Sequence, residues 1–459
     1  MRRSWMWLVL VGGVWGCGSR DGAAPQAEST LPLLSIPAST NPEVKKALGL
    51  LSEGQAGDAI AAATAAISRS PEDASLYDAR AHIFHRLGQI DAAMTDLHRA
   101  VQLDPKNARY LNNRGFLLLG QHQIDAAFAD FNQAHTLDPE LVSAYNNRAL
   151  VEITRGRYRQ ALVDLEEALK RDPKYVDALN NRGFALMQLG RLDRALADFN
   201  AAVTLSPKYT NAWNNRGLVK RQLGDLDGAM LDFTQAMLLD PNNPKYYDHR
   251  KDVYLLQGEM QKAKEDERKI HFLMTLRALS ESIQRAPREP APYLARAEHF
   301  RQQGDDAAAR RDFDRAVEFA AKTDSVVILR RAAFLRDCKE FAAAVTDCDA
   351  VLANGAHQLA WSIRGDCRKA LRDYEGAIQD YEAAKRLDEA VIETYSLKAE
   401  DLSRRGDVTE ADRLRTKAEQ LSSVFAQQQT ESATAQPFPA DGENVDIKRT
   451  AAAIQPLPE

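Results

Sequence analysis

The chain has 459 residues, which is enough for two or three ordinary domains or for one long repeat array. It is 44% hydrophobic and 27% charged, with only 7% aromatic residues and abundant alanine, a composition typical of helices that pack closely through small residues. The formal net charge of −5 argues against a general nucleic-acid binder, which would be basic.

The first residues have the order of a secretion signal. Arg2 and Arg3 precede an apolar stretch over residues 5–15, which is too short to span a bilayer, and Cys17 follows. This order resembles a bacterial lipoprotein signal, although Trp15 is bulkier than the family prefers. The resemblance implies a signal peptide over residues 1–16, lipidation of Cys17 and a cell-envelope location, with Gly18 favouring the outer membrane facing the periplasm. The alternative is an uncleaved anchor with an incidental cysteine.

The region between this signal and the first helical pattern is rich in Gly, Ala, Ser and Pro. Residues 17–39 are therefore predicted to be a flexible tether. A glutamine run and several prolines, with little apolar periodicity, predict a disordered tail over residues 422–459.

An internal repeat occupies most of the chain between these ends. Six prolines recur 34 residues apart, at positions 71, 105, 139, 173, 207 and 241. One alanine keeps the same period, at positions 59, 93, 127, 161, 195, 229 and 263, and another follows it seven residues later. Glycine or alanine stands twelve residues before the first alanine, as in Ala81, Gly115 and Gly183.

These residues, with an aromatic or leucine six residues after each proline, resemble the tetratricopeptide repeat (TPR). The resemblance covers about residues 40–421 and implies an all-α, right-handed superhelical solenoid of about eleven helix-turn-helix repeats. The period breaks after Pro241, because the next equivalent proline is Pro287, 46 residues on. We therefore expect two blocks: seven repeats over 40–267, an inserted helical segment or hinge over 268–289, and four repeats over 290–421.

One arginine recurs in nine repeats, and an aspartate follows it sixteen residues later every time. The last repeat has lost both partners together, with Lys398 and Leu414 in their places. This joint pattern predicts an ion pair between the two helices of each repeat, with a structural role. The nine pairs are Arg80–Asp96, Arg114–Asp130, Arg148–Asp164, Arg182–Asp198, Arg216–Asp232, Arg250–Asp266, Arg296–Asp312, Arg331–Asp347 and Arg364–Asp380.

Four consecutive repeats carry two asparagines immediately before the arginine. The first asparagines are Asn112, Asn146, Asn180 and Asn214; the second asparagines are Asn113, Asn147, Asn181 and Asn215. One helical turn after the first asparagines lie the stripe residues Phe116, Leu150, Phe184 and Leu218. The resemblance places this face on the concave side of the superhelix. In peptide-binding members of the family, the residue at the position of the second asparagines often touches the ligand. In other members it only supports neighbouring helices.

We interpret these twelve residues as a groove for an extended peptide. A side-chain amide can both donate hydrogen bonds to a peptide backbone and accept them from it. The first helices of successive repeats are expected about 9 Å apart, which matches the length of roughly three residues of extended chain. The alternative is that the asparagines are merely tolerated in duplicated repeats. Capture of a C-terminal carboxylate is not expected, because no repeat offers the lysine–asparagine pair that the TPR clamp for such tails uses. Asp78 and Asp248 stand at the ends of the asparagine series.

The remaining chemistry-bearing residues are assigned to the scaffold. Cys338, Cys348 and Cys367 match no zinc spacing and are expected to be buried, with a disulfide left open. His82 and His85 are weak candidates for a metal site. The sequence therefore predicts a non-enzymatic scaffold or assembly adaptor without cofactor or metal, whose partner is a protein or peptide and not nucleic acid. The alternative is a self-associating envelope protein, because Leu402, Leu414 and Leu421 are expected to leave an apolar edge on the last repeat that could pack on another copy.

Overall fold

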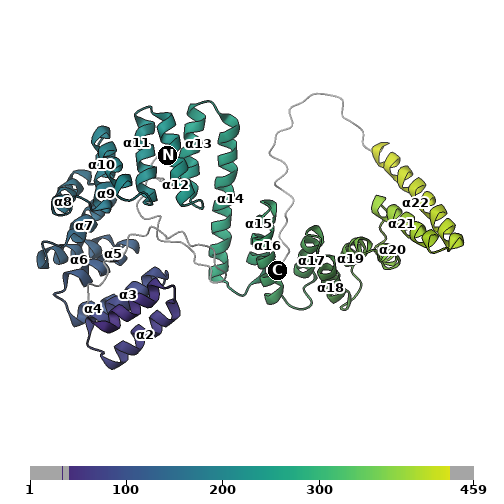
Figure 1. Ribbon diagram of the computed structural model, residues 1–459, viewed down its shortest axis with the longest axis horizontal. Coiled ribbons are helices and arrows are strands. Elements are labelled where there is room, and N and C mark those ends of the chain that lie inside the picture. Colours follow the sequence, from purple (N-terminus) through teal and green to yellow (C-terminus); the bar gives the residue numbers. More distant parts are fainter. Residues whose placement is uncertain (1–33, 35–40, 435–459) are drawn as a thin grey trace, which may run out of the picture. The chain divides into compact units, whose positions relative to one another are not determined.

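The computed structural model describes Leu34 and residues 41–434 of the chain (Figure 1). Every element in these residues is an α-helix, as predicted for an all-α solenoid. The predicted signal peptide, Cys17, the tether apart from Leu34 and the end of the tail lie outside the described residues. Within the described part, no helix combines the length and hydropathy needed to cross a bilayer.

The chain divides into two compact units, residues 1–277 and 278–459. The helices of unit 1 are α1 (Pro42–Ser52), α2 (Ala56–Arg69), α3 (Ala74–Arg86), α4 (Ile90–Leu103), α5 (Ala108–Gly120), α6 (Ile124–Leu137), α7 (Val142–Thr154), α8 (Tyr158–Arg171), α9 (Val176–Gln188), α10 (Leu192–Leu205), α11 (Thr210–Gln222), α12 (Leu226–Leu239), α13 (Pro244–Leu256) and most of α14 (Met260–Arg285). Unit 2 continues with α15 (Pro290–Gln302), α16 (Asp306–Phe319), α17 (Ser325–Asp337), α18 (Phe341–Leu352), α19 (Gln358–Ala370), α20 (Tyr374–Ala383), α21 (Glu389–Arg404) and α22 (Val408–Thr434).

These helices form eleven successive pairs, and each pair corresponds to one sequence repeat. In the third pair, α5 has 13 residues and α6 has 14, with a short turn at residues 121–123. So short a connection makes the two helices antiparallel neighbours. A helix of this length is marginal alone in water, so each repeat depends on packing against the next one.

Small residues let the two helices of a repeat approach each other. A Cβ built on Gly183 of α9 would lie 2.8 Å from Cε1 of Phe199 on α10, which is closer than real side chains pack. Gly115 and Gly217 face Phe131 and Phe233 in the same way. The glycine is therefore required by the phenyl ring opposite it.

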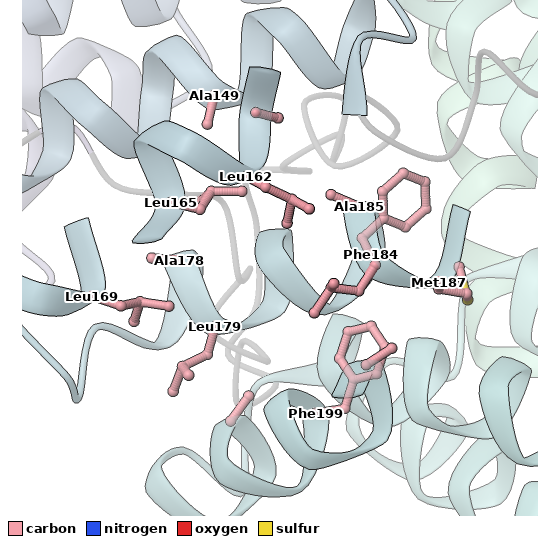
Figure 2. Close-up of a cluster of buried hydrophobic side chains, with 14 of the residues drawn as sticks. Ala149, Leu162, Leu165, Leu169, Ala178, Leu179, Phe184, Ala185, Met187 and Phe199 are labelled. Atoms are coloured by element: carbon pink, nitrogen blue, oxygen red, sulfur yellow. The ribbon is translucent and has the colours of Figure 1, made fainter. Parts of the chain in front are cut away.

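The alanines of the repeat are buried at the same interfaces. Ala161, Ala168, Ala195 and Ala202 are all fully buried in one apolar cluster. Figure 2 shows side chains of this cluster, including Ala149 of α7, Leu165 of α8, Phe184 of α9 and Phe199 of α10. The cluster thus joins consecutive repeats into one continuous core, as expected for stacked repeats.

Where an aromatic residue stands six residues after the proline, it fixes the junction between repeats. The hydroxyl of Tyr145 donates to the carbonyl of Pro139 at 3.1 Å, and Nε1 of Trp213 donates to the carbonyl of Pro207 at 2.8 Å. Tyr77 and Tyr247 make the equivalent bond to their own prolines. The proline ends a helix, and its free carbonyl is then satisfied by the first helix of the next repeat.

The described parts of the two irregular regions of the sequence are mostly helical. Residues 268–285 of the predicted insertion lie in α14, which runs without interruption from Met260 to Arg285, and the boundary between the units falls inside this helix. The tail was predicted to begin at residue 422, but α22 continues to Thr434, so this boundary was wrong. The stretch after Leu421 holds Ala, Gln and Glu and no Pro or Gly before Pro437, so nothing stops the helix there.

The apolar edge predicted for the last repeat is also not open. Leu414 is only 8% exposed, and Leu402 and Leu421 pack against the same cluster, which contains Tyr395 of α21. These leucines form the core of the last helix pair, because α22 covers α21. The packed leucines therefore do not support self-association through this edge, and self-association through another surface stays a prediction.

The glycine–phenylalanine contact gives a stability test. We expect Gly183→Ala to lower the free energy of unfolding by about 1–3 kcal/mol, because the added methyl group overlaps the Phe199 ring. Adding Phe199→Leu should recover part of this loss, since the repeat with Ala149 has Leu165 opposite it. Urea unfolding followed by circular dichroism measures the change. Gly57→Ala, where a Cβ meets nothing within 4 Å, is the control; equal effects of the two alanines would contradict the packing argument.

Candidate functional site

The repeat arginines pair with their aspartates as predicted. In all nine repeats, Nε donates to Oδ2 and Nη2 donates to Oδ1 of the aspartate sixteen residues on, at 2.5–2.9 Å. The aspartates are buried, and the hydrogen bond to Asp130 raises the pKa of Arg114. In the repeat that lost the pair, Lys398 pairs with Glu375 and Leu414 is buried. The structural role predicted for these arginines is confirmed.

Several of these arginines also reach the preceding repeat. Nη1 of Arg148 donates to Oδ1 of Asn132 at 3.1 Å, and Nη1 of Arg216 donates to Oδ1 of Asn200 at 3.0 Å. Arg331 makes the same connection to Asp314. The guanidinium group is planar and has five N–H donors, so it can bind its own repeat with two donors and the previous repeat with a third.

The eight paired asparagines are all buried, with at most 9% of each residue exposed. Three of the four second asparagines donate from Nδ2 to Oδ1 of the first asparagine in the preceding repeat. These bonds join Asn147 to Asn112 (3.0 Å), Asn181 to Asn146 (2.9 Å) and Asn215 to Asn180 (3.0 Å). Within one repeat, Nδ2 of the first asparagine also donates to Oδ1 of the second, as from Asn146 to Asn147 at 3.2 Å.

Other polar groups extend this asparagine ladder at both ends. Asn113 donates to Oδ1 of Asp78 at 2.9 Å, and Nδ1 of His249 lies 2.7 Å from Oδ1 of Asn214. Burial raises the pKa of Asp78 to about 6, against the opposing effects of Arg109 and Asn113. Burial lowers the pKa of His249 to about 4, so at neutral pH this ring is uncharged and donates through an Nδ1–H. The ladder thus runs through six consecutive repeats, from α3 to α13.

The asparagines therefore do not stand as free amides on an open surface, as the groove interpretation assumed. Helical spacing correctly predicted which face they share, but the neighbouring repeat buries them and uses them for stacking. An amide has two N–H donors and two acceptor lone pairs, and the bonds named above use one of each on Asn146 and Asn180. Binding of a ligand to the remaining capacity stays a prediction.

The stripe residues follow the first asparagines on α5, α7, α9 and α11. Phe116, Leu150 and Leu218 are half-buried, whereas Phe184 is only 7% exposed. Phe116 and Leu150 pack against one apolar cluster, and Phe184 belongs to the next one along the chain. The structure thus places an apolar surface beside the asparagine ladder over four repeats.

Three buried residues of unit 1 were missed or misjudged from the sequence. Leu34 was assigned to the tether, yet it is only 2% exposed and belongs to the apolar cluster that Phe116 and Leu150 pack against. His82 and His85, the weak candidates for a metal site, are also buried, at 5% and 2% exposed, and burial lowers the pKa of each to about 4. The one sequence signal for Leu34 was the apolar run of Leu31, Leu33, Leu34 and Ile36 inside an otherwise small and polar segment.

Unit 2 has no equivalent of the asparagine ladder among its described residues. Where the asparagines would stand it has Leu329, which is buried, and Ser362, whose Oγ accepts from Nη1 of Arg386 at 3.0 Å. Arg386 also pairs with Asp366 at 2.7 Å, and Arg336 pairs with the same carboxylate at 3.2 Å. Around Ser362, this face of unit 2 therefore carries paired charges.

The cysteines of unit 2 are structural. Cys348 and Cys367 are fully buried and, like Cys338, free. Burial raises the pKa of the Cys348 thiol to about 12 and that of Cys367 to about 11, so both stay protonated at neutral pH. Among the described residues, no three His, Cys, Asp or Glu side chains are grouped so that they could hold a metal ion.

A double-mutant cycle tests the ladder. We expect Asn146→Ala and Asn181→Ala to destabilise the protein by about 1–3 kcal/mol each, because each leaves a buried amide without its partner. The two changes together should cost about 1 kcal/mol less than their sum, since the Asn146–Asn181 bond is lost only once. Thermal or urea unfolding gives the energies. Asn147 and Asn214 are not bonded to each other and provide the control cycle; a coupling near zero for both cycles would refute the ladder.

Comparison with known proteins agrees with this architecture. Two family models described as tetratricopeptide repeat match residues 146–210 and 185–245 and residues 360–391, and a model described as TPR repeat matches residues 81–122. No curated protein matches the chain significantly.

The chain is also similar to several solved structures. YrrB, described as a TPR protein with an unusual peptide-binding site, is 22% identical over 41% of this chain and 97% of its own, with a TM-score of 0.32. A thermophilic TPR protein of Thermus thermophilus is 21% identical over 38% and 94%, with a TM-score of 0.34. Pseudomonas aeruginosa PilF is 21% identical over 46% and 96%, with a TM-score of 0.40. From the matched repeats and the helix pairs that carry them, we conclude that the chain belongs to the tetratricopeptide repeat proteins.

Proposed function

We propose that this protein is a non-enzymatic scaffold that binds an extended segment of a partner protein along the first helices of its N-terminal repeats. Tetratricopeptide repeats generally serve as protein-interaction scaffolds, and the matched models cover much of this block. The observation that carries the proposal is the apolar stripe: Phe116, Leu150 and Leu218 keep part of their side chains exposed at one helix per repeat. A surface that repeats its chemistry at constant spacing suits a ligand that is itself a repeating backbone.

The geometry of stacked repeats agrees with an extended ligand. Neighbouring helices lie about 8–10 Å apart, and an extended chain rises about 3.3 Å per residue, so each repeat meets roughly every third residue of the ligand. The stripe residues supply the apolar contacts. The spare amide capacity of Asn146 and Asn180 supplies bonds to the ligand backbone.

Because the ladder amides also hold the repeats together, affinity depends mainly on the apolar stripe. A hydrogen bond contributes about 1 kcal/mol net, whereas a fully buried leucine or phenylalanine side chain contributes about 1.5–3 kcal/mol. We therefore place the specificity of the groove in the side chains of Phe116, Leu150, Phe184 and Leu218.

We further propose that the scaffold acts at the bacterial cell envelope. A lipid on Cys17 would anchor it in the outer membrane, on the side that faces the periplasm. The support is the order of charged start, apolar run, Gly16 and Cys17 in the sequence. An adaptor of this kind would bring a partner to the membrane surface without needing a membrane-spanning helix of its own.

The groove is tested by changing its stripe without touching the ladder. We expect the double variant Leu150→Lys and Leu218→Lys to lose at least nine-tenths of the partner that crosslinks to the wild-type chain in membranes, because charges replace the apolar contacts. Lysine stems can stay against the helix while their charges reach water, so the fold should be kept. Quantitative mass spectrometry of the crosslinked material measures the loss, and circular dichroism checks the helices.

The matched control carries the same changes on the second helices of the same repeats. Val163 of α8 and Leu231 of α12 are 63% and 71% exposed, so Val163→Lys and Leu231→Lys should leave the partner bound. Equal losses in the two double variants, or none in either, would contradict a groove on the first helices. If the only crosslinked product is a second copy of this chain, the protein is a self-associating structural protein and not an adaptor.

Lipidation is tested separately. Cells producing the full chain and fed radiolabelled palmitate should incorporate the label into it, and Cys17→Ala should abolish this while Cys338→Ala keeps it. The reason is that the acyl groups are attached at the cysteine that follows the signal. Label that survives Cys17→Ala would show that the segment is not a lipoprotein signal.

A further inference from the structure

Leu34 is the one residue before the first repeat that the structure describes, and it is buried. Only 2% of its surface is exposed, which matches the core leucines of the repeats. It lies seven residues before Asn41, which caps α1 and donates from Nδ2 to Oδ2 of Asp73 at 2.7 Å. Seven residue steps reach at most about 25 Å, so Leu34 can lie on repeats beyond the first while α1 stays in place.

The apolar cluster that contains Leu34 belongs to later repeats. Its buried members include Ala81 of α3, Leu119 of α5 and Val151 of α7, and the half-buried Phe116 and Leu150 pack against it. Phe116 and Leu150 are two of the four stripe residues. A leucine from outside the repeats therefore shares a cluster with half of the proposed partner-binding surface.

Polar groups with unused hydrogen-bonding capacity lie on the same side of repeat two. Asp78, His82 and His85 occupy the positions on α3 that Asn112, Phe116 and Leu119 occupy on α5, so helical spacing puts them on the equivalent face. All three are at least nine-tenths buried, and Nδ1 of both histidines makes no hydrogen bond, whereas Oδ2 of Asp78 is ion-paired with Nη2 of Arg109 at 3.4 Å.

These groups point to a polar ligand beside the leucine. The ring of His85 lies edge-on to Phe116, with centroids 6.0 Å apart. Buried polar atoms without partners are unfavourable, so a ligand backbone that donates to or accepts from them would bind more strongly than its apolar contacts alone predict.

From this placement we infer that the face of repeats two to four is a recognition site for a leucine in an extended segment, and that Leu34 fills it in cis until a partner leucine displaces it. The inference rests on the proposed function and names both the partner chemistry and its regulation. The sequence around Leu34 fits an extended segment, because Pro32 and Pro37 flank it and each disfavours helix in the residue before it.

The cis contact would set the threshold for partner binding. A segment on a short linker is present at an effective concentration in the millimolar range, so even a weak contact stays occupied. A partner then binds with its intrinsic dissociation constant divided by the fraction of open sites. Losing the buried leucine should raise that open fraction, and hence trans affinity, by about tenfold or more.

The test uses the full chain in detergent and a fluorescein-labelled peptide with the sequence of residues 29–40. Fluorescence anisotropy gives the dissociation constant. We expect the Leu34→Asp chain to bind this peptide at least ten times more tightly than the wild-type chain, whose site is filled. Leu238→Asp, at a residue of α12 that is 72% exposed, makes the same change elsewhere and should bind like wild type. A peptide carrying the same Leu34→Asp change should not bind any of the three chains.

The other outcomes overturn the inference. Equal affinity of the wild-type and Leu34→Asp chains would show that Leu34 does not occupy the site in cis. No binding by any chain, with unchanged circular dichroism, would show that the face does not recognise this leucine. Neither result depends on the partner crosslinked through Leu150 and Leu218, so failure here is distinguishable from failure of the proposed function.

Discussion

The solenoid depends on one charged contact, the fork between a repeat arginine and the aspartate sixteen residues after it. Nine repeats make it with the same two bonds, Nε to Oδ2 and Nη2 to Oδ1, and the aspartate is buried each time. A buried pair of this kind adds little net stability, because removing two charges from water opposes their attraction. Its value is geometric: two parallel bonds fix the distance and rotation of the second helix relative to the first. With a third donor on the preceding repeat, as from Arg148 to Asn132, the same side chain also sets the angle between repeats.

The asparagine ladder adds a second polar connection that only part of the chain has. It links the first helices of six consecutive repeats, whereas in unit 2 the equivalent face carries ion pairs such as Arg386–Asp366. An amide pair is neutral and specific in direction, so it fixes the register of neighbouring helices without the desolvation cost of charges. The N-terminal block can therefore bury polar atoms on the face that we propose for binding and keep an apolar stripe next to them. The face of unit 2 that carries ion pairs such as Arg386–Asp366 does not offer this combination.

Much of this architecture could be predicted from the sequence because the same kinds of residue recur at the same spacing in successive repeats. The period of 34 residues, the spacing of sixteen between Arg182 and Asp198, and the small residue at Gly183 each recur, so one helix pair explains the others. The asparagines were harder, because helical spacing says which side chains share a face but not how closely the next repeat covers it. Asn146 looks the same in sequence whether its amide meets solvent or Asn181. The end of α22 was missed because a polar helix without Pro or Gly has the composition of a tail.

Leu34 shows a different limit, since nothing about a single leucine reports where it packs. Periodicity identifies a core residue only when neighbours repeat the pattern, and a residue outside the repeats has no such neighbours. What places it is the receiving surface: Phe116 and Leu150 pack against the same apolar cluster, and His85, whose buried Nδ1 makes no hydrogen bond, lies edge-on to Phe116. In a solenoid that uses its polar side chains for internal geometry, exposed apolar residues on the first helices are the remaining means of recognition. On the proposal made above, an apolar segment tethered nearby competes for them, which would make the sequence before the first repeat part of the binding equilibrium and not only a spacer.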